Sequence, residues 1–222
     1  MLKKTKLTKR EIEERLAGLG DYVKIDFLTR SLNNTDLETR RFVLVKLSEI
    51  YESLKMYFES AKSIRSAADI NTSDEGRMKD HLRSMELFIK SDNYDEGEIS
   101  LTKAMACAKE SQKQILKRKR IEIYKNQAEE YIKKEKWKKT MTLYERFIRL
   151  TEISNEERNK AQSELLKIYD KLGKISEYGS LKRSLEAPAR AAQPQVKETK
   201  ENDFDVDAFI GKQNVKKPKS FY

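Results

Sequence analysis

The chain has few of the residues that interrupt helices. Its 222 residues include only three prolines and seven glycines. The prolines, Pro188, Pro194 and Pro218, all lie in the last 36 residues. A proline inside a helix costs about 3 kcal/mol, so the absence of proline before Pro188 permits helix throughout residues 1–187.

Cysteine and long apolar runs are also scarce. The single cysteine, Cys107, excludes an intrachain disulfide and gives no sign of an oxidising compartment. No apolar run approaches the roughly 20 residues that a membrane-spanning helix needs. The first residues, MLKKTKLTKREIEERL, lack the apolar core of a signal peptide. We therefore predict a soluble cytoplasmic protein without a membrane span.

The residues that carry most enzyme chemistry are equally few. His81 is the only histidine, so no Ser–His–Asp set or His-rich metal cluster is available. Cys107 lies in KAMACAK, a run of small residues that indicates helix packing rather than a nucleophile. GLGD at 18–21 lacks the third glycine and the Gly-Lys-Ser/Thr ending of a phosphate loop. We predict no enzymatic activity, no cofactor and no metal.

Charge is plentiful and unevenly distributed. Charged residues make up 38% and hydrophobic residues 37% of the chain, a balance that favours thin helical architectures over a thick core. The net charge is +10, and residues 109–139 carry twelve basic and five acidic residues. The positive charge therefore belongs to a short N-terminal arm and one helical region rather than to the whole surface.

A large apolar or aromatic residue followed six positions later by another recurs along the chain. The pairs are Tyr51/Tyr57, Phe88/Tyr94, Tyr131/Trp137 and Tyr169/Ile175, with Leu16/Tyr22 as a weaker copy. A small residue follows nine positions after the first member in three copies: Ser60, Gly97 and Thr140. Two antiparallel helices meeting at a tight bend explain this pattern, because small residues let the helices cross closely. One hairpin cannot bury both of its faces, so we expect neighbouring hairpins to stack.

This unit resembles the tetratricopeptide repeat (TPR) family, through IYESLKMYFESAKSIRSAA (50–68), FIKSDNYDEGEISLTKA (88–104) and IYDKLGKISEY (168–178). The resemblance covers about residues 8–186 and implies an all-α fold, an α-solenoid of four to five antiparallel helix hairpins. The copies are spaced by 37, 43 and 38 residues, against about 34 in the family, so we expect longer helices. The expected organisation is a basic arm over 1–8, a TPR-like domain over 9–186 and a tail over 187–222.

The tail differs in composition from the rest of the chain. Residues 187–222 are rich in Ala, Pro, Gln, Lys and Glu and have no amphipathic period, which predicts disorder. Within the tail, DFDVDAFIG has the form of a short linear motif with Phe204 and Phe209 as anchors. This motif is expected either to bind the chain's own repeats or a neighbour's, or to dock onto a separate partner.

In the tetratricopeptide family, the first helix of each unit lines a concave groove that holds extended peptides or helices. Carried over by register, the resemblance implies groove positions at Lys79, Leu82, Glu86, Ile89 and Lys90 in the second unit. In the third and fourth units it implies Glu122, Lys125, Glu129, Ile132, Lys133, Lys160, Ser163, Lys167, Asp170 and Lys171. The resemblance thus implies a protein–protein interaction scaffold or adaptor with a lysine-rich groove, and we expect an acidic protein or peptide partner.

The basic stretch KRKRIEIYKNQAEEYIKKEKWKK (117–139) leaves a second interpretation open. It is either a solvated lysine-rich face with Trp137 as a packing residue, or a site for an anionic partner. The alternative function is therefore an RNA- or DNA-associated protein that uses the basic arm and residues 117–139. Interruption of the stretch by Glu122, Glu129, Glu130 and Glu135 argues against nucleic acid.

Overall fold

The computed structural model describes the backbone of residues 6–191 and the side chains of residues 6–186. This part of the chain is all-α, with ten α-helices, one 3-10 helix η1 (Leu32–Asn34) and no strand. The helices are α1 (Lys9–Leu16), α2 (Asp21–Ser31), α3 (Leu37–Ser53), α4 (Tyr57–Asp69), α5 (Asp74–Lys90), α6 (Tyr94–Cys107), α7 (Glu110–Lys133), α8 (Trp137–Phe147), α9 (Asn155–Lys171) and α10 (Ile175–Ala191).

The chain divides into two units, Met1–Leu181 and Lys182–Tyr222. The first unit contains α1 to α9 and the start of α10, and the second contains the rest of α10. Helix α10 ends at Ala191, so it continues five residues past Glu186, where we expected the tail to begin. Pro188 therefore lies within a helix and does not terminate it.

Polar side chains cap the N-termini of several helices. Asp36 caps α3 by accepting a hydrogen bond from the Thr39 amide at 2.7 Å. Ser73 caps α5, and Ser154 forms a capping box with Glu157 at the start of α9. These side chains satisfy amide groups that a helix leaves without a partner in its first turn.

The repeated pairs of large residues flank one kind of turn. Four residues after the first member of each strong pair, the backbone is left-handed, with φ of 61° at Lys55, 64° at Asp92, 53° at Glu135 and 66° at Gly173. The next amide then donates to the carbonyl of the first member, from Met56 to Tyr51, Asn93 to Phe88, Lys136 to Tyr131 and Lys174 to Tyr169, at 2.8–2.9 Å. This is the Schellman motif, which ends one helix and lets the next begin at once.

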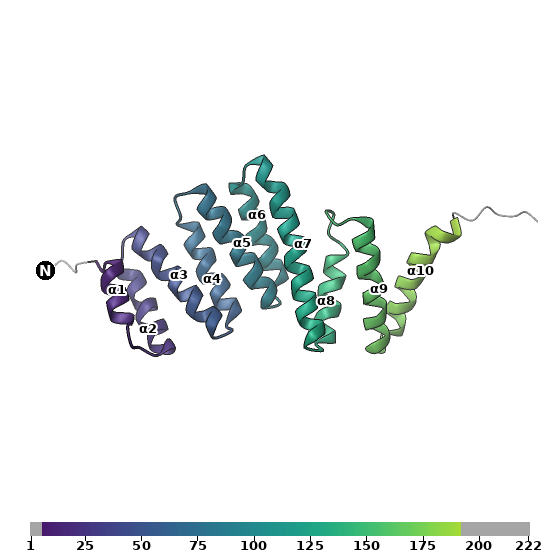
Figure 1. Ribbon diagram of the computed structural model, residues 1–222, viewed down its shortest axis with the longest axis horizontal. Coiled ribbons are helices and arrows are strands. Elements are labelled where there is room, and N and C mark those ends of the chain that lie inside the picture. The colour runs from purple at the N-terminus through teal and green to yellow at the C-terminus, as the bar shows by residue number, and fades with distance from the viewer. Residues whose placement is uncertain (1–5, 192–222) are drawn as a thin grey trace, which may run out of the picture. The chain divides into compact units, whose positions relative to one another are not determined.

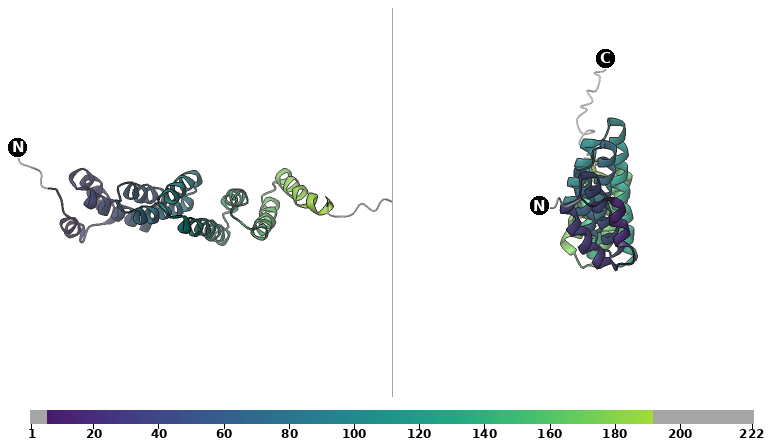
Figure 2. Two further views of the ribbon diagram at one scale, coloured as in Figure 1. Left: turned by 90° about the horizontal axis from the view of Figure 1, so that it is seen from above. Right: turned by 90° about the vertical axis from the view of Figure 1, so that its left-hand side faces the viewer.

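The small residues of the repeat lie where helices cross. Ser60, Gly97 and Thr140 are all buried. A hydrogen bond from the Ser60 hydroxyl to the Ser48 carbonyl at 2.8 Å joins α4 to α3. From α2 to α9, each helix of the first unit packs against the next one in sequence, and the helix axes run roughly alongside one another (Figures 1 and 2).

The core is a series of local clusters instead of one thick centre. The first joins α1, α2 and α3 around Ile12, Leu28 and Val43. A second joins α3, α4 and α5, and a third extends from α5 to α9. Each cluster is built from helices close in sequence, which explains how a chain with 37% hydrophobic residues remains folded.

The weak first copy of the repeat departs from the other four. Gly18 is left-handed at φ 76°, but it lies two residues after Leu16 rather than four. Tyr22 is exposed by 72% instead of packing beside the bend. The α1–α2 connection is therefore a different turn, and Leu16/Tyr22 is not an equivalent pair.

The left-handed turns lead to a prediction about stability. Replacing Glu135 by Gly should raise the free energy of unfolding by about 1 kcal/mol, because glycine adopts positive φ without a Cβ clash. Gly173→Ala should lower it by a similar amount. Chemical denaturation checks both, with Glu135→Ala as a control that keeps the Cβ and stays near the native value. A loss of stability in Glu135→Gly would contradict the role of this turn.

The helix crossing at Gly97 gives a second prediction. A Cβ on Gly97 would lie 3.1 Å from Ile89 Cδ1, whereas one on Gly179 would meet nothing within 4 Å. Gly97→Leu should therefore destabilise the protein by about 1–3 kcal/mol through overpacking. Gly179→Leu is the matched control and should be neutral or stabilising, since leucine favours helix over glycine. Equal thermal shifts in the two variants would show that Gly97 is not at a close crossing.

Candidate functional site

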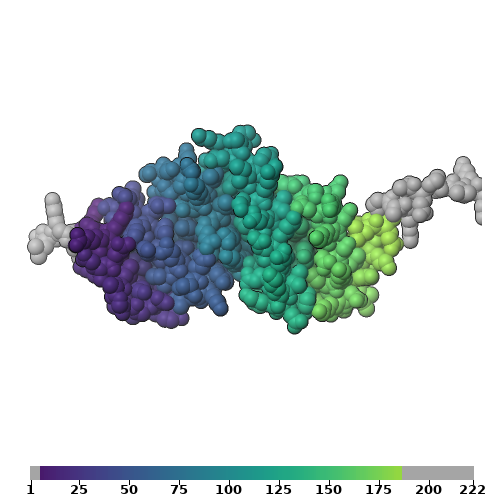
Figure 3. Space-filling model, viewed as in Figure 1, coloured from purple at the N-terminus to yellow at the C-terminus, as the bar shows by residue number. Residues whose placement is uncertain are grey.

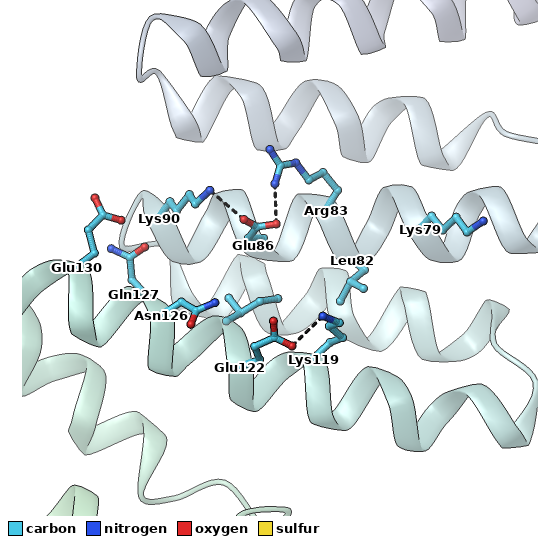
Figure 4. Close-up of a pocket in the computed structure, with 11 residues that line it drawn as sticks. Lys79, Leu82, Arg83, Glu86, Lys90, Lys119, Glu122, Asn126, Gln127 and Glu130 are labelled. Carbon is cyan, nitrogen blue, oxygen red and sulfur yellow. Dashed lines mark hydrogen bonds and ion pairs between the residues drawn. The ribbon is translucent and has the colours of Figure 1, made fainter.

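A pocket of about 330 Å³ lies between α5 and α7 (Figure 4), and we call it the α5–α7 pocket. Its residues on α5 are Lys79, Leu82, Arg83, Glu86 and Lys90, and those on α7 are Lys119, Glu122, Ile123, Asn126, Gln127 and Glu130. Positions three and four apart share one face of a helix, so these spacings place one stripe of each helix against the pocket. The space-filling view shows α7, in teal, between the blue surface of the earlier helices and the green surface of α8 and α9 (Figure 3).

Ion pairs connect the charged residues of α5 with one another and with α3. Arg83 contacts Glu86 at 2.6 Å and Glu52 of α3, and Lys90 contacts Glu86 at 2.9 Å. Burial by itself would raise the pKa of Glu86, but the hydrogen bonds from Lys90 and Arg83, together with their charges, hold that pKa below its usual value. Glu86 is therefore ionised at neutral pH and held in place by two cations.

The remaining charges of the α5–α7 pocket are also paired. Lys119 contacts Glu122 at 2.8 Å on α7, and Lys79 contacts Glu75 at 2.6 Å on α5. Glu130 pairs with Lys134 at the end of α7. Most of the charge in this pocket is thus compensated by neighbouring side chains of the chain itself.

Two uncharged amides line the α7 side of the same pocket. Asn126 is exposed, whereas Gln127 is only 4% exposed. Figure 4 shows both side chains on the side of α7 that faces α5. Within the described residues, the Gln127 amide forms no hydrogen bond, and its polar atoms are not fully enclosed. The amide is therefore buried at the pocket wall and open toward the pocket.

A second pocket, also of about 330 Å³, lies between α7, α8 and α9, and we call it the α7–α9 pocket. Two of the predicted lysines, Lys125 and Lys160, line it. Lys125 forms an ion pair with Glu157, whose pKa is lowered by this hydrogen bond and by the backbone amide of Ser154. Glu129 and Glu164 line the pocket as well, so its two lysines face three carboxylates.

The other predicted groove residues lie on α7 and α9. Lys167 is exposed and pairs with Glu164 at 2.7 Å. The Lys171 ammonium lies 3.7 Å from the ring centroid of Trp137 on α8. Ile132 is half-buried and Lys133 is exposed, both at the C-terminal end of α7. Among the predicted groove lysines, Lys125 and Lys167 are therefore paired with carboxylates.

The positions on α5 that were expected from the repeat register lie close to one another. Lys79, Leu82, Glu86 and Lys90, four of the five positions expected on this helix, line the α5–α7 pocket. Ile89, the fifth expected residue, is fully buried in the core beside Gly97.

Sequence reasoning missed Arg83, Lys119, Asn126, Gln127 and Glu130, which also line this pocket. A signal for Gln127 was present in the repeat itself. Four positions before the first member of each pair, the other copies have Leu47, Ser84 and Leu165, all buried. Ser84 donates a hydrogen bond to the Ala61 carbonyl at 3.0 Å. Gln127 is the one large polar residue at this position.

The basic stretch 117–139 extends along α7 into α8. Arg120 is directed into the fold, where it pairs with Glu98 at 2.7 Å and Glu152 at 3.1 Å. Lys139 pairs with Asp92 of the preceding hairpin. Between Lys119 and Lys133, the helix rises by about 21 Å at 1.5 Å per residue. The basic residues at the two ends of α7 therefore form separate groups.

The tail anchors Phe204 and Phe209 lie outside the described residues. Cys107 is the last residue of α6 and is half-buried. Among the described residues, no helix is long and apolar enough to cross a membrane. In the same residues, no group of three or more His, Cys, Asp or Glu side chains has the geometry to hold a metal ion.

Comparisons with known proteins do not identify a family for this chain. No family model and no curated protein sequence matches the chain. The crystal structure of BtubC (BKLC) from P. vanneervenii is similar at 12% sequence identity and a TM-score of 0.35, over 96% of this chain and 83% of that one. A similarity at this level carries no argument about the family or function of the chain.

His81 lies on α5 next to the pocket residue Leu82 but is itself buried, with 3% exposure. Its Nε2 lies 3.7 Å from Asp69 Oδ1, and its Nδ1 is enclosed without a partner. Burial lowers the pKa of His81, and the nearby Lys103 and Arg77 lower it further, against the opposing effect of Asp69 and Asp80.

This environment makes folding stability depend on pH. The unfolded chain binds a proton on His81 near pH 6.5, whereas the folded chain does so only at lower pH. Stability should therefore be complete above about pH 6.5 and fall as the pH decreases through the folded-state pKa. Thermal unfolding between pH 7.0 and 5.5 should show a decrease in Tm for the native chain and a smaller decrease for His81→Gln. Identical pH profiles would show that His81 is not the group responsible.

Proposed function

We propose that the protein is a non-catalytic scaffold or adaptor that binds a segment of another protein on the side of α5 and α7 that contains the α5–α7 pocket. The observation that carries this proposal is the pocket itself, a space of about 330 Å³ with an apolar floor at Leu82 and Ile123 and polar walls. Its volume is at the lower end of the 300–1,000 Å³ range of ligand pockets, which suits a few residues of a peptide.

The repeated turns support a TPR-like solenoid as the framework of this proposal. Four reversals share one hydrogen-bond pattern, and each helix from α2 to α9 packs against its neighbour in sequence. Repetition of this kind places the first helices α3, α5, α7 and α9 in equivalent positions, with surfaces available to a partner. A cytoplasmic location belongs to the same proposal, since the single cysteine excludes an intrachain disulfide.

The chemistry of the pocket supports binding over catalysis. A general acid or base at neutral pH needs a pKa near 7, but that of Glu86 is held below the ordinary value for a carboxyl group. The neighbouring charges are paired with each other, which stabilises their ionised forms. Such a lining recognises a ligand and holds it.

The pairing of the lysines also changes the expected partner. We expected an acidic ligand, but Lys125 and Lys167 are each paired with a carboxylate. In the α7–α9 pocket the carboxylates outnumber the lysines. We therefore propose that the partner is selected by shape and hydrogen bonding more than by negative charge.

A photo-crosslinking experiment tests the scaffold proposal. The exposed Asn126 in the pocket is replaced by p-benzoylphenylalanine in the full chain, expressed in its native cells and irradiated. We expect protease-sensitive adducts of defined mass. The same substitution at the exposed Thr102 on α6 is the control and should not give these adducts. Identical adducts at both positions would contradict a binding site in the pocket.

The nucleic-acid alternative has its own measurement. A generic 20-nucleotide single strand is titrated with the full chain between 50 and 500 mM salt. A backbone binder loses affinity steeply across this range, because each phosphate contact releases counterions. Tight binding with a steep salt slope, together with nuclease-sensitive adducts at Asn126, would replace the scaffold proposal. We expect neither.

A further inference from the structure

The turns within the hairpins lie along one edge of the first unit, which we call the turn edge (Figure 1). It comprises the connections α1–α2, α3–α4, α5–α6, α7–α8 and α9–α10, together with the first turn of each second helix. Contacts between successive connections support this arrangement. Lys139 at the start of α8 pairs with Asp92 of the α5–α6 turn. The Lys171 ammonium at the end of α9 lies 3.7 Å from the ring centroid of Trp137, the first residue of α8.

Large apolar side chains are exposed mainly at this edge. Of the eight exposed ones in the part of the chain that the structure describes, five belong to it: Tyr22, Val23, Met56, Phe58 and Ile175. Ile175 is 83% exposed and Tyr22 is 72% exposed, although Tyr94, at the same position of the repeat, is only 4% exposed. The turn itself therefore does not require these side chains to face water.

Positive charge is concentrated at the α7–α8 turn of the same edge. Five of the seven residues 133–139 are lysines and one is a glutamate. Lys133, Lys136 and Lys138 are exposed, and within the described residues none of the three has a carboxylate partner. The first turn of α8 contains no acidic residue that would offset them. The turn edge therefore combines uncompensated cations with exposed apolar side chains.

This combination matches the boundary layer of an anionic lipid bilayer. Peripheral proteins bind there through apolar side chains that enter the headgroup region and through lysines that are attracted to anionic lipids. Single-stranded nucleic acid binds by stacking on aromatic rings, which leaves no role for Val23, Met56 or Ile175. A protein partner needs a continuous apolar centre, whereas these three side chains belong to three different hairpins.

We propose that the turn edge binds the surface of an anionic phospholipid bilayer. The exposed apolar side chains of the edge enter the headgroup region, and the lysines of the α7–α8 turn lie beside the anionic headgroups. The turn edge is formed by the ends of the helices, whereas the α5–α7 pocket lies between the sides of two helices. Membrane binding is therefore a second function, and it does not depend on the proposed scaffold function.

Co-sedimentation with vesicles tests the electrostatic part of the proposal. The full chain is mixed at low salt with vesicles of phosphatidylcholine alone, or of three parts phosphatidylcholine to one part phosphatidylserine. We expect sedimentation with the anionic vesicles and little with the neutral ones. The triple variant Lys133→Gln/Lys136→Gln/Lys138→Gln should bind the anionic vesicles about tenfold more weakly or worse, because each cation near the surface adds to the attraction.

A matched control removes the same charge from the opposite edge. Lys109, Lys117 and Arg118 lie at or near the start of α7, by the connection from α6. Within the described residues, these three cations also have no carboxylate partner. The triple variant with glutamine at these positions should bind the anionic vesicles like the native chain. Equal losses in the two triple variants would show only a general effect of net charge and would overturn the proposal.

The apolar part of the proposal has its own pair of variants. Ile175→Ser should weaken binding to the anionic vesicles about threefold to tenfold, because less apolar surface enters the headgroup region. Ile115→Ser is the control, since Ile115 is 58% exposed but lies in the second turn of α7, away from the turn edge. Both side chains face water, so both variants should melt like the native chain. Native binding by Ile175→Ser would contradict insertion of the turn edge.

The orientation on the membrane is read from Trp137, the only tryptophan of the chain. Anionic vesicles that contain phosphatidylcholine brominated near the headgroup end of its acyl chains should quench its fluorescence, and unbrominated vesicles should not. Sedimentation without quenching would place another surface against the lipid and overturn the proposal, as would the absence of sedimentation. If the Lys133/Lys136/Lys138 variant binds vesicles normally but loses binding to the single-stranded oligonucleotide, the α7–α8 turn is a nucleic-acid surface and the lipid proposal is wrong.

Discussion

The backbone reversal after α3, α5, α7 and α9 constrains the rest of this fold. In each case the chain turns through a single left-handed residue, and the carbonyl of a Tyr or Phe accepts the amide that closes the turn. The following helix begins directly after this amide, so its crossing with the preceding helix is fixed within a few residues. Ser60, Gly97 and Thr140 are buried because that geometry brings the backbones close at those points. Three of the four turns use Lys, Asp or Glu where glycine would be easier, so hydrogen bonding and packing outweigh the local strain.

Polar contacts join neighbouring hairpins in addition to the apolar clusters that span them. Tyr124 donates to Glu98 at 2.9 Å, and Glu98 also pairs with Arg120. Tyr131 donates to Asp92, which pairs with Lys139. Burial and the neighbouring carboxylates raise the pKa of both tyrosines, so each hydroxyl stays protonated and remains a donor. These contacts join α6 and the α5–α6 turn to α7 and α8, and they use charges that would otherwise be available to a partner.

Charge compensation therefore determines what the pocket surface can recognise. Lysine content suggests an acidic ligand, but a lysine paired with a nearby carboxylate has little attraction left for a second anion. In the α5–α7 pocket the groups left without partners are neutral amides, and one of them occupies a packing position of the repeat. Local departures from an otherwise consistent pattern are expected at functional sites. Gln127 is the clearest departure of this kind in the described residues.

The sequence by itself determined the helical fold and the recurrence of the four turns. These features depend on residues within one or two turns of a helix, where spacing along the chain is also spacing in space. Helical spacing also placed Lys79, Leu82, Glu86 and Lys90 on one face of a helix, and these four residues line the α5–α7 pocket. The sequence placed the start of the tail at residue 187 from a change in composition, whereas α10 continues to Ala191.

Only the tertiary structure decided which charged side chains have an ion-pair partner. The pairs Lys125–Glu157, Arg83–Glu52 and Arg120–Glu152 join residues 31 or 32 positions apart. The first two link different helices, and the third links α7 to the connection between α8 and α9. The periodicity of the sequence does not indicate these ion-pair partners, because the pairs depend on how one hairpin packs against the next. The same holds for Gln127: its amide is recognisable as unpartnered only once α5 and α7 lie on either side of the pocket.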